Sequence, residues 1–192
     1  MSHAVTPVAL SPAVDRHGRP RPWEELRSAD QLTELLGDPH PIVIDKVHAE
    51  LTEDDLGILS RSSLCVLSTS DEEGNCDTSP RGDAPGFVHV IDPHTVAIPD
   101  RPGNRRSDSF RNILRNPHVG VLHLVPGSAD VLRVNGRARI LTDAPFFDLM
   151  TVKGQRPQLA LVIELDEIFR HCSNSLRRSG VWDPATWTQS PA

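Results

Sequence analysis

Alternation of apolar and polar residues is clearest along residues 131–141. The apolar or small positions alternate there with polar ones, in the order Leu132, Arg133, Val134, Asn135, Gly136, Arg137, Ala138, Arg139 and Ile140. A period of two places one set on a buried face and the other on a face that meets solvent or a ligand, as in an antiparallel strand. Shorter β-branched and apolar runs predict further strands at residues 64–69, at 77–79 resuming at 87–91, at 95–98, at 119–125 and at 159–165.

Only a few short helices are expected between these strands. Ser28 is a suitable N-cap for a helix over residues 28–36, which Gly37 would end. A second helix is predicted to begin at Thr52, because the acidic residues that follow suit the positive end of the helix dipole. A third spans residues 107–116, capped by Ser107 or Asp108, and stops before Pro117. Together these elements predict a mainly β (α+β) fold: a small six-stranded antiparallel barrel with peripheral helices, without βαβ units.

Length and composition indicate one globular domain, with 192 residues of which 38% are hydrophobic and 24% charged. Residues 1–22, rich in proline, are expected to form an irregular N-terminal arm, and residues 23–192 the folded domain. The net charge of −6 argues against general nucleic-acid binding, and aromatic residues for base stacking are scarce, at 4% with no tyrosine. No apolar run is long enough for a membrane span, and the first residues make a poor signal peptide.

Cysteines and histidines give no pattern of their own. The three cysteines are too few and too far apart for a disulfide framework or a zinc knuckle, so we expect a cytoplasmic protein. The nine histidines are scattered, and we expect no metal site.

Five arginines fall within residues 100–115, although the chain is acidic overall. Arg101, Arg105 and Arg106 lie on a Pro-Gly loop that leads into the predicted helix at 107–116, where backbone N–H groups and arginines together suit a phosphate. The alternative is a solvated surface or a salt-bridge network, which is the expected role of Arg111 and Arg115. The nucleotide-binding motifs GxGxxG and GxxxxGK[ST] are both absent.

A second cluster, DTSPRGDAPG at residues 77–86, places two prolines and two glycines inside a predicted strand. Such an interruption marks a bulge or a close approach of a ligand to the backbone, or else a long hairpin loop.

Three stretches resemble one known family. SPRGDAPGFV at 79–88, IPDRPGNRRSDSFRNIL at 98–114 with NPHVGVL at 116–122, and LRVNGRARI at 132–140 are similar to the pyridoxamine 5'-phosphate oxidase-like FMN-binding split-barrel family, in particular its bacterial FMN-dependent flavoproteins. The tail HCSNSLRRSGVWDP at 171–184 resembles the same subgroup, so the resemblance spans roughly residues 40–184. The Arg-x-His that ends vitamin B6 phosphate oxidases is absent, because Arg170 and His171 are adjacent.

The resemblance implies a flavin reductase/PNP-oxidase-like split barrel that binds FMN and forms a homodimer, with shared flavin sites at the interface. It casts Arg105 and Arg106 as the pair that holds the FMN phosphate. The assisting residues would be Asn104, Ser109 and Asn112, and the residues beside the ribityl chain or ring would be Ser79, Arg81 and Gly82. His171 and Arg178 are candidates for the partner's site, or else ordinary surface residues.

The function expected on this basis is an FMN-dependent oxidoreductase that acts on a small organic substrate through flavin N5, with no side chain assigned as a general acid or base. Two alternatives stay open: a deazaflavin-dependent reductase, and a flavin- or haem-binding carrier or sensor without turnover.

Overall fold

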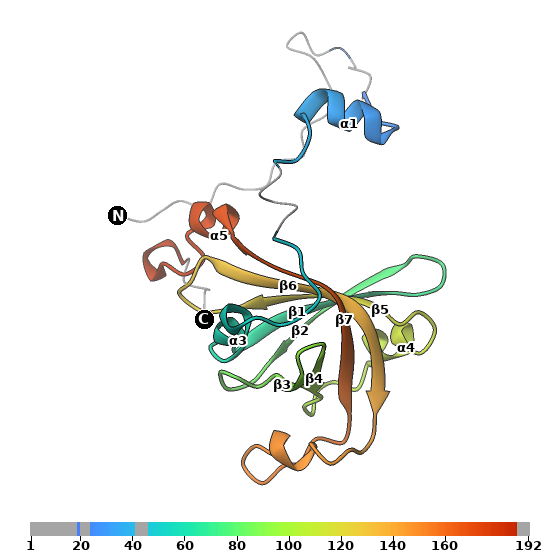
Figure 1. Cartoon of the computed structure of the whole chain (residues 1–192), viewed down its shortest axis with the longest axis vertical. Coiled ribbons are helices and arrows are strands. Elements are labelled where there is room, and N and C mark those ends of the chain that lie inside the picture. The colour runs from blue at the N-terminus through green and yellow to red at the C-terminus, as the bar shows by residue number, and fades with distance from the viewer. Residues whose placement is uncertain (1–18, 20–23, 41–45, 188–192) are drawn as a thin grey trace.

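The computed structural model describes residues 19, 24–40 and 46–187. The predicted arm at residues 1–22 lies outside them except for Arg19, and the boundary at residue 23 stays a prediction. Seven antiparallel strands form one sheet that curves into a split barrel (Figure 1). None of the described helices is long and apolar enough to cross a membrane.

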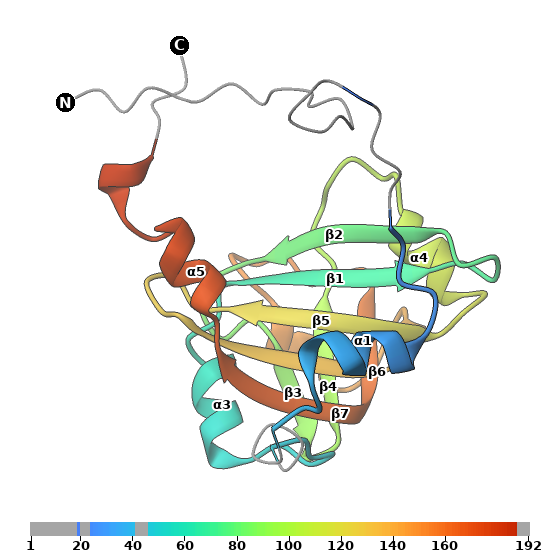
Figure 2. The same ribbon diagram turned by 90° about the horizontal axis from the view of Figure 1, so that it is seen from above.

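The strands lie in the order β2-β1-β5-β6-β7-β4-β3, so β2 and β3 are the two edges. Their bounds are β1 Leu64–Ser70, β2 Cys76–Gly82, β3 His89–Asp92, β4 Thr95–Pro99, β5 His118–Leu124, β6 Asp130–Leu141 and β7 Ala160–Cys172. Figure 2 shows β2, β1, β5 and β6 side by side along one wall.

The prediction of six strands is wrong, because residues 77–91 do not form one interrupted strand. They form β2 and β3, which lie at opposite edges of the sheet, and residues 83–88 connect these edges. The predicted interruption at Pro80 is also wrong, since Pro80 pairs with Val66 within β2. An edge strand tolerates proline because one of its sides needs no ladder donor.

The predicted alternation in β6 is confirmed. Leu132, Val134 and Ala138 are buried, whereas Arg133, Arg137 and Arg139 are exposed. A register shift lies between Asn135 and Gly136, and a Cβ on Gly136 would come within 2.1 Å of the Glu164 carbonyl oxygen. Close packing of β6 on β7 therefore requires glycine at this position.

Most buried apolar side chains form one cluster inside the barrel, which includes Leu67, Val121, Leu132 and Ile163. A smaller cluster lies on the other face of β4 and β7, where Ala97 and Val162 pack with Phe147 and Met150 at the short 3₁₀ helix η1, Asp148–Met150. This second cluster fixes the start of the segment that leads to residues 152–159.

The helices are short and peripheral. They are α1 Ala29–Leu36, α3 Glu53–Leu59, α4 Asp108–Ile113 and α5 Asn174–Ser179, followed by the 3₁₀ helix η2, Pro184–Thr186. The predicted N-caps Ser28 and Thr52 are confirmed, because their hydroxyls accept from the N–H of Gln31 and Asp55 respectively. The helix predicted over 107–116 is shorter than expected, and no side chain caps it. Ser107 occupies the N-cap position but has a left-handed φ of 61°, which turns its hydroxyl toward the Arg105 carbonyl instead.

The last strand also differs from its prediction. Residues 159–165 were expected to form it, but β7 continues to Cys172 because the bulged β6 pairs with it along its whole length. His171 consequently lies on a strand opposite Val131, and the C-terminal tail begins after it.

Candidate functional site

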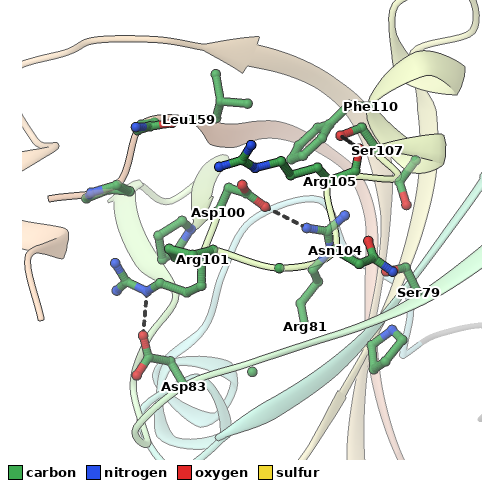
Figure 3. Close-up of a pocket in the computed structure, with 18 of the residues that line it drawn as sticks. Ser79, Arg81, Asp83, Asp100, Arg101, Asn104, Arg105, Ser107, Phe110 and Leu159 are labelled. Carbon is green, nitrogen blue, oxygen red and sulfur yellow. Dashed lines mark hydrogen bonds and ion pairs between the residues drawn. The ribbon is translucent and has the colours of Figure 1, made fainter. Parts of the chain in front are cut away.

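An open pocket of about 1340 Å³ lies at one side of the barrel, and three segments form its walls (Figure 3). They are β2 with the next residue (77–83), the end of β4 with the loop and start of α4 (99–110), and the segment 152–159. Ligand pockets in proteins usually measure about 300–1000 Å³. The pocket is therefore large enough for a cofactor together with a second small molecule.

Strained backbone marks the loop between β4 and α4. Arg105 and Ser107 have φ angles of 62° and 61°, which residues other than glycine seldom adopt. The Asn104 side-chain oxygen accepts from the Arg106 N–H at 3.0 Å and helps to hold this conformation. Such strain persists where the surroundings fix it, and it is concentrated at functional sites.

Two ion pairs join β2 to the loop after β4. Arg81 donates to Asp100 with an Nη1–Oδ1 distance of 2.8 Å, and Arg101 donates to Asp83 with an Nε–Oδ2 distance of 2.5 Å. Arg101 also donates to the Met150 carbonyl at 2.9 Å. Arg101 thus links the loop after β4 both to the end of β2 and to the residues just before the third wall, the segment 152–159.

The two aspartates of these pairs differ in their titration. Burial raises the pKa of Asp100 and outweighs the opposing effect of Arg81. Burial also acts to raise the pKa of Asp83, but the Ala84 N–H and the Arg101 guanidinium together bring it below its ordinary value. Asp100 consequently takes up a proton at a higher pH than Asp83 does.

Cationic side chains outnumber anionic ones in the lining of the pocket, and one of them, Arg156, pairs with Asp143 and Asp148 outside the lining. The lining has six cationic and four anionic side chains: Arg81, Arg101, Arg105, Arg106, Lys153 and Arg156, and Asp77, Asp83, Asp100 and Asp108. Arg106 pairs with Asp108, whereas the Arg105 guanidinium forms no ion pair or hydrogen bond with any residue that the structure describes. The buried Nε of Arg81 also lacks a partner there. The exposed Arg105 guanidinium is therefore a donor available to an anionic ligand.

A scan against protein families matches residues 51–172 to the family described as pyridoxamine 5'-phosphate oxidase. This match covers more than half of the chain. The chain belongs to the pyridoxamine 5'-phosphate oxidase family. The resemblance inferred from the three sequence stretches is confirmed at this level.

Solved structures of other proteins share the fold of this chain. The HupZ protein of Group A Streptococcus is 16% identical with a TM-score of 0.52, and a provisionally assigned pyridoxamine 5'-phosphate oxidase from Lactobacillus delbrueckii is 22% identical with a TM-score of 0.51. Each comparison covers 64% of this chain and 95% of the other. At this identity the similarity shows the fold alone. A search of curated proteins finds no match.

Most residues that the family resemblance assigned to FMN come together. Those that line the pocket are Ser79, Arg81, Gly82, Asn104, Arg105, Arg106 and Ser109. Ser109 is buried and its hydroxyl donates to Asp77 at 2.6 Å. Gly82 has a packing reason as well, because a Cβ there would come within 2.8 Å of the Ser63 carbonyl oxygen.

Asn112 does not line the pocket, since its amide donates to the Thr69 hydroxyl at 3.1 Å on β1. His171 and Arg178, near the end of β7 and on α5, are not in its lining either. The His171 ring stacks on Phe169 at a centroid distance of 6.1 Å, and its Nδ1 is buried without a partner in the described part of the chain. Their assignment to a partner's site remains a prediction.

Sequence reasoning missed the third wall. Lys153, Gln155 and Arg156 follow no motif, and they reach the pocket only because Arg101 and the Phe147 cluster hold the preceding turn. It also missed Phe110, although an aromatic residue in the first turn after the arginine loop was a signal. The Arg81 guanidinium lies 5.0 Å from the centre of the Phe110 ring.

Proposed function

We propose that this protein is an FMN-dependent oxidoreductase that acts on a small organic substrate. The observation that carries the proposal is the unpartnered Arg105 guanidinium, which lies on a strained loop in a large pocket of a family member. A phosphate is a fitting ligand for such a group, because charge-assisted hydrogen bonds from arginine to phosphate are among the strongest in proteins.

The donor set of the pocket fits FMN. Arg105 would hold the phosphate, with Asn104 and Arg106 beside it on the same loop. The phosphate bears close to two negative charges, which suits the unpartnered guanidinium of Arg105 in the lining. Arg81, placed by Asp100 and Phe110, would lie beside the polar edge of the ring or the ribityl chain.

Bound FMN would supply hydride transfer at its N5 atom. The chain's own residues would anchor the phosphate, fix the orientation of the ring and shape the space for the substrate. The ion pairs of Arg81 and Arg101 keep two walls at a constant separation, which is the positioning that such a reaction requires. No side chain is needed as a general acid or base.

The proposal includes a homodimer in the cytoplasm, in which His171 and Arg178 of each chain contact the flavin of the other. The buried, unpartnered Nδ1 of His171 supports a ligand or partner at that position, because buried polar atoms seldom lack one. Sedimentation at low concentration with and without FMN tests the shared site. Linkage predicts tighter dimerisation with FMN, whereas a monomer of full flavin affinity would contradict it.

The cofactor is tested by the absorption spectrum of the purified full-length protein and by titration with FMN, a deazaflavin and haem. FMN should bind most tightly and then be reduced by NADH or NADPH and reoxidised by an added acceptor. Preference for the deazaflavin would establish a deazaflavin-dependent reductase. Tight binding of FMN or haem without turnover of any donor and acceptor pair would indicate a carrier or sensor.

A further inference from the structure

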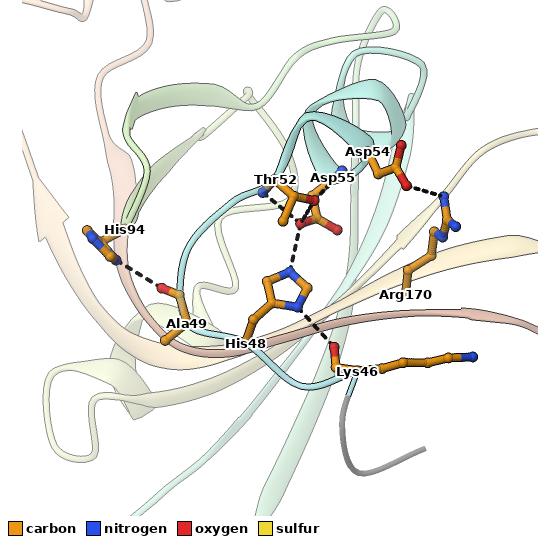
Figure 4. Close-up of polar contacts among 8 residues, drawn as sticks. All are labelled: Lys46, His48, Ala49, Thr52, Asp54, Asp55, His94 and Arg170. Atoms are coloured by element: carbon orange, nitrogen blue, oxygen red, sulfur yellow. Dashed lines mark hydrogen bonds and ion pairs between the residues drawn. The ribbon is translucent and has the colours of Figure 1, made fainter. Parts of the chain in front are cut away.

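Residues 46–52 lie against the barrel and lead into α3 (Figure 4). None of the residues labelled there lines the pocket. The His48 N–H donates to the Ile168 carbonyl on β7 at 3.0 Å, and the Ile168 N–H donates back at 2.6 Å. The Leu51 N–H donates to the Pro93 carbonyl at 2.8 Å. A short stretch of backbone is thus held against both β7 and the turn between β3 and β4.

The His48 ring faces an acceptor at each nitrogen. Its Nδ1 lies 2.9 Å from the Lys46 carbonyl oxygen, and its Nε2 lies 2.8 Å from Oδ2 of Asp55. A carbonyl oxygen and an ionised carboxylate can only accept hydrogen bonds. Both contacts are therefore hydrogen bonds only when the ring carries two protons.

Asp55 is built to remain ionised. Its side chain is 2% exposed, and the same Oδ2 accepts from the Thr52 N–H at 2.9 Å and from the Thr52 hydroxyl at 2.6 Å. A neutral His48 would leave a ring lone pair facing either this carboxylate or the Lys46 carbonyl. Loss of one proton therefore replaces an attraction with a repulsion at one end of the ring.

We infer that His48, Asp55 and Thr52 form a proton-dependent clasp, which fixes residues 46–52 against the start of α3. The clasp thereby stabilises the backbone pairing of this segment with β7 when His48 is charged, and weakens it when His48 loses its proton. The inference concerns the attachment of this segment and does not depend on the proposed flavin chemistry.

The other charged groups around the clasp come from each element packed against it. Asp54 on α3 pairs with Arg170 on β7 at 3.3 Å, and both are largely exposed. On the β3–β4 turn, Nδ1 of His94 lies 3.0 Å from the Ala49 carbonyl oxygen. The other charged residues of these elements are Lys46 and Glu50 in the segment, Glu53 on α3, Asp92 at the end of β3, and Glu167 next to Ile168 on β7. The neighbour that faces His48 with a charge at hydrogen-bond distance is Asp55.

The direction of the pKa shifts agrees with the geometry. Burial acts to lower the pKa of His48, but the Asp55 carboxylate and the Lys46 carbonyl raise it above its ordinary value of 6.5. Burial acts to raise the pKa of Asp55, but Thr52 and His48 bring it below 3.8. The attachment is strongest at pH values between the lowered pKa of Asp55 and 6.5, and it weakens as pH rises through the raised pKa of His48. It weakens again in acid, as pH falls through the pKa of Asp55.

Amide hydrogen exchange of the full-length protein between pH 6 and 9 tests the clasp, after correction for the intrinsic pH dependence of exchange. The amides of His48 and Ile168 should lose about 10- to 100-fold of their protection over this range. The reason is that the side chain of His48 loses a charge-assisted hydrogen bond that supports the backbone pairing of these amides. Amides of the β5–β6 ladder, such as Val121, serve as the internal reference. Constant protection of His48 and Ile168 across the range would overturn the inference.

Variants separate the clasp from general effects. H48Q should abolish the pH dependence, and H94Q, which changes a neighbouring histidine with a single acceptor, should preserve it. Retention of the wild-type pH profile in H48Q would contradict the assignment to His48. Nitrogen chemical shifts of the His48 ring in the unaltered protein give an answer even if H48Q does not fold. Both nitrogens should be protonated at pH 6, and a neutral ring at that pH would overturn the inference.

Discussion

The pocket beside β2 and the clasp around His48 are both rich in charge, but they differ in how completely the charges are satisfied. In the clasp, both ring nitrogens of His48 and the buried oxygen of Asp55 have partners within 3 Å. In the pocket, the Arg105 guanidinium has no partner among the described residues, and neither has Nε of Arg81. A satisfied network stabilises the fold, whereas the exposed, unsatisfied Arg105 guanidinium on a strained loop is prepared for a ligand.

The comparison predicts different consequences of substitution in the two regions. Changes in the clasp should lower the stability of the protein and leave FMN binding unaltered. Changes at the unpartnered pocket residues should weaken FMN binding and leave the stability of the protein unaltered.

D55A should destabilise the protein by about 3 kcal/mol, because it removes a capping box and leaves Thr52 and His48 without their acceptor. Urea denaturation at pH 6.5 measures the change, and the FMN dissociation constant of the folded variant should match wild type. D54A is the matched control, since its exposed pair with Arg170 should contribute less than about 1 kcal/mol. Equal effects of D54A and D55A would remove the basis of the clasp.

His123 offers a contrast with His48, because its burial in the barrel lowers its pKa to about 4 and keeps it neutral. The unfolded chain takes up a proton below pH 6.5 and the folded chain does not, so stability falls as pH decreases from 6.5 toward 4. The loss from this residue should approach about 3 kcal/mol. H123L should reduce this acid sensitivity by a similar amount. Parallel stability curves for H123L and wild type from pH 7 to 4 would contradict the prediction.

R101A should cost about 2 kcal/mol, because it breaks a partly buried ion pair with Asp83 and a hydrogen bond to the Met150 carbonyl. The third wall of the pocket should loosen as a result, which faster hydrogen exchange in residues 151–159 would show. R111A, on the exposed side of α4, should change stability by less than about 0.5 kcal/mol. Unchanged exchange in R101A would mean that the Phe147 cluster alone fixes this wall.

R106A should produce the smallest effect. Its side chain is 79% exposed and already pairs with Asp108, whose negative charge weakens the attraction between Arg106 and a phosphate. FMN affinity should fall by about threefold or less, measured by quenching of flavin fluorescence. A loss of tenfold or more would show that Arg106 exchanges Asp108 for the phosphate, as the arginine pair assigned by the family resemblance requires.

Local sequence patterns predicted the elements that local interactions determine. Ser28 and Thr52 cap helices through bonds to residues three positions away, and β6 follows its own alternation. They did not predict the separation of β2 from β3, because the placement of two strands at opposite edges depends on pairing with β1 and β4. The length of β7 was missed for the same reason.

The candidate site shows the same division. The arginine loop was evident from its composition, and the family resemblance added Ser79, Arg81 and Gly82. The distinction between Arg105 and Arg106 was not predictable, because it arises from the left-handed backbone at Arg105 and the pairing of its neighbour with Asp108. Lys153 and Arg156 lie more than forty positions from that loop in the sequence and reach the pocket through tertiary packing.

The binding of FMN and of riboflavin to wild type and to R105A tests the central claim most directly. Loss of one charge-assisted hydrogen bond to the phosphate should weaken FMN binding by about 10- to 100-fold. Riboflavin, which lacks the phosphate, should bind both proteins equally and weakly, and R115A should bind FMN like wild type. If folded R105A binds FMN as tightly as wild type, Arg105 is surface charge and the pocket does not hold the phosphate in the proposed way.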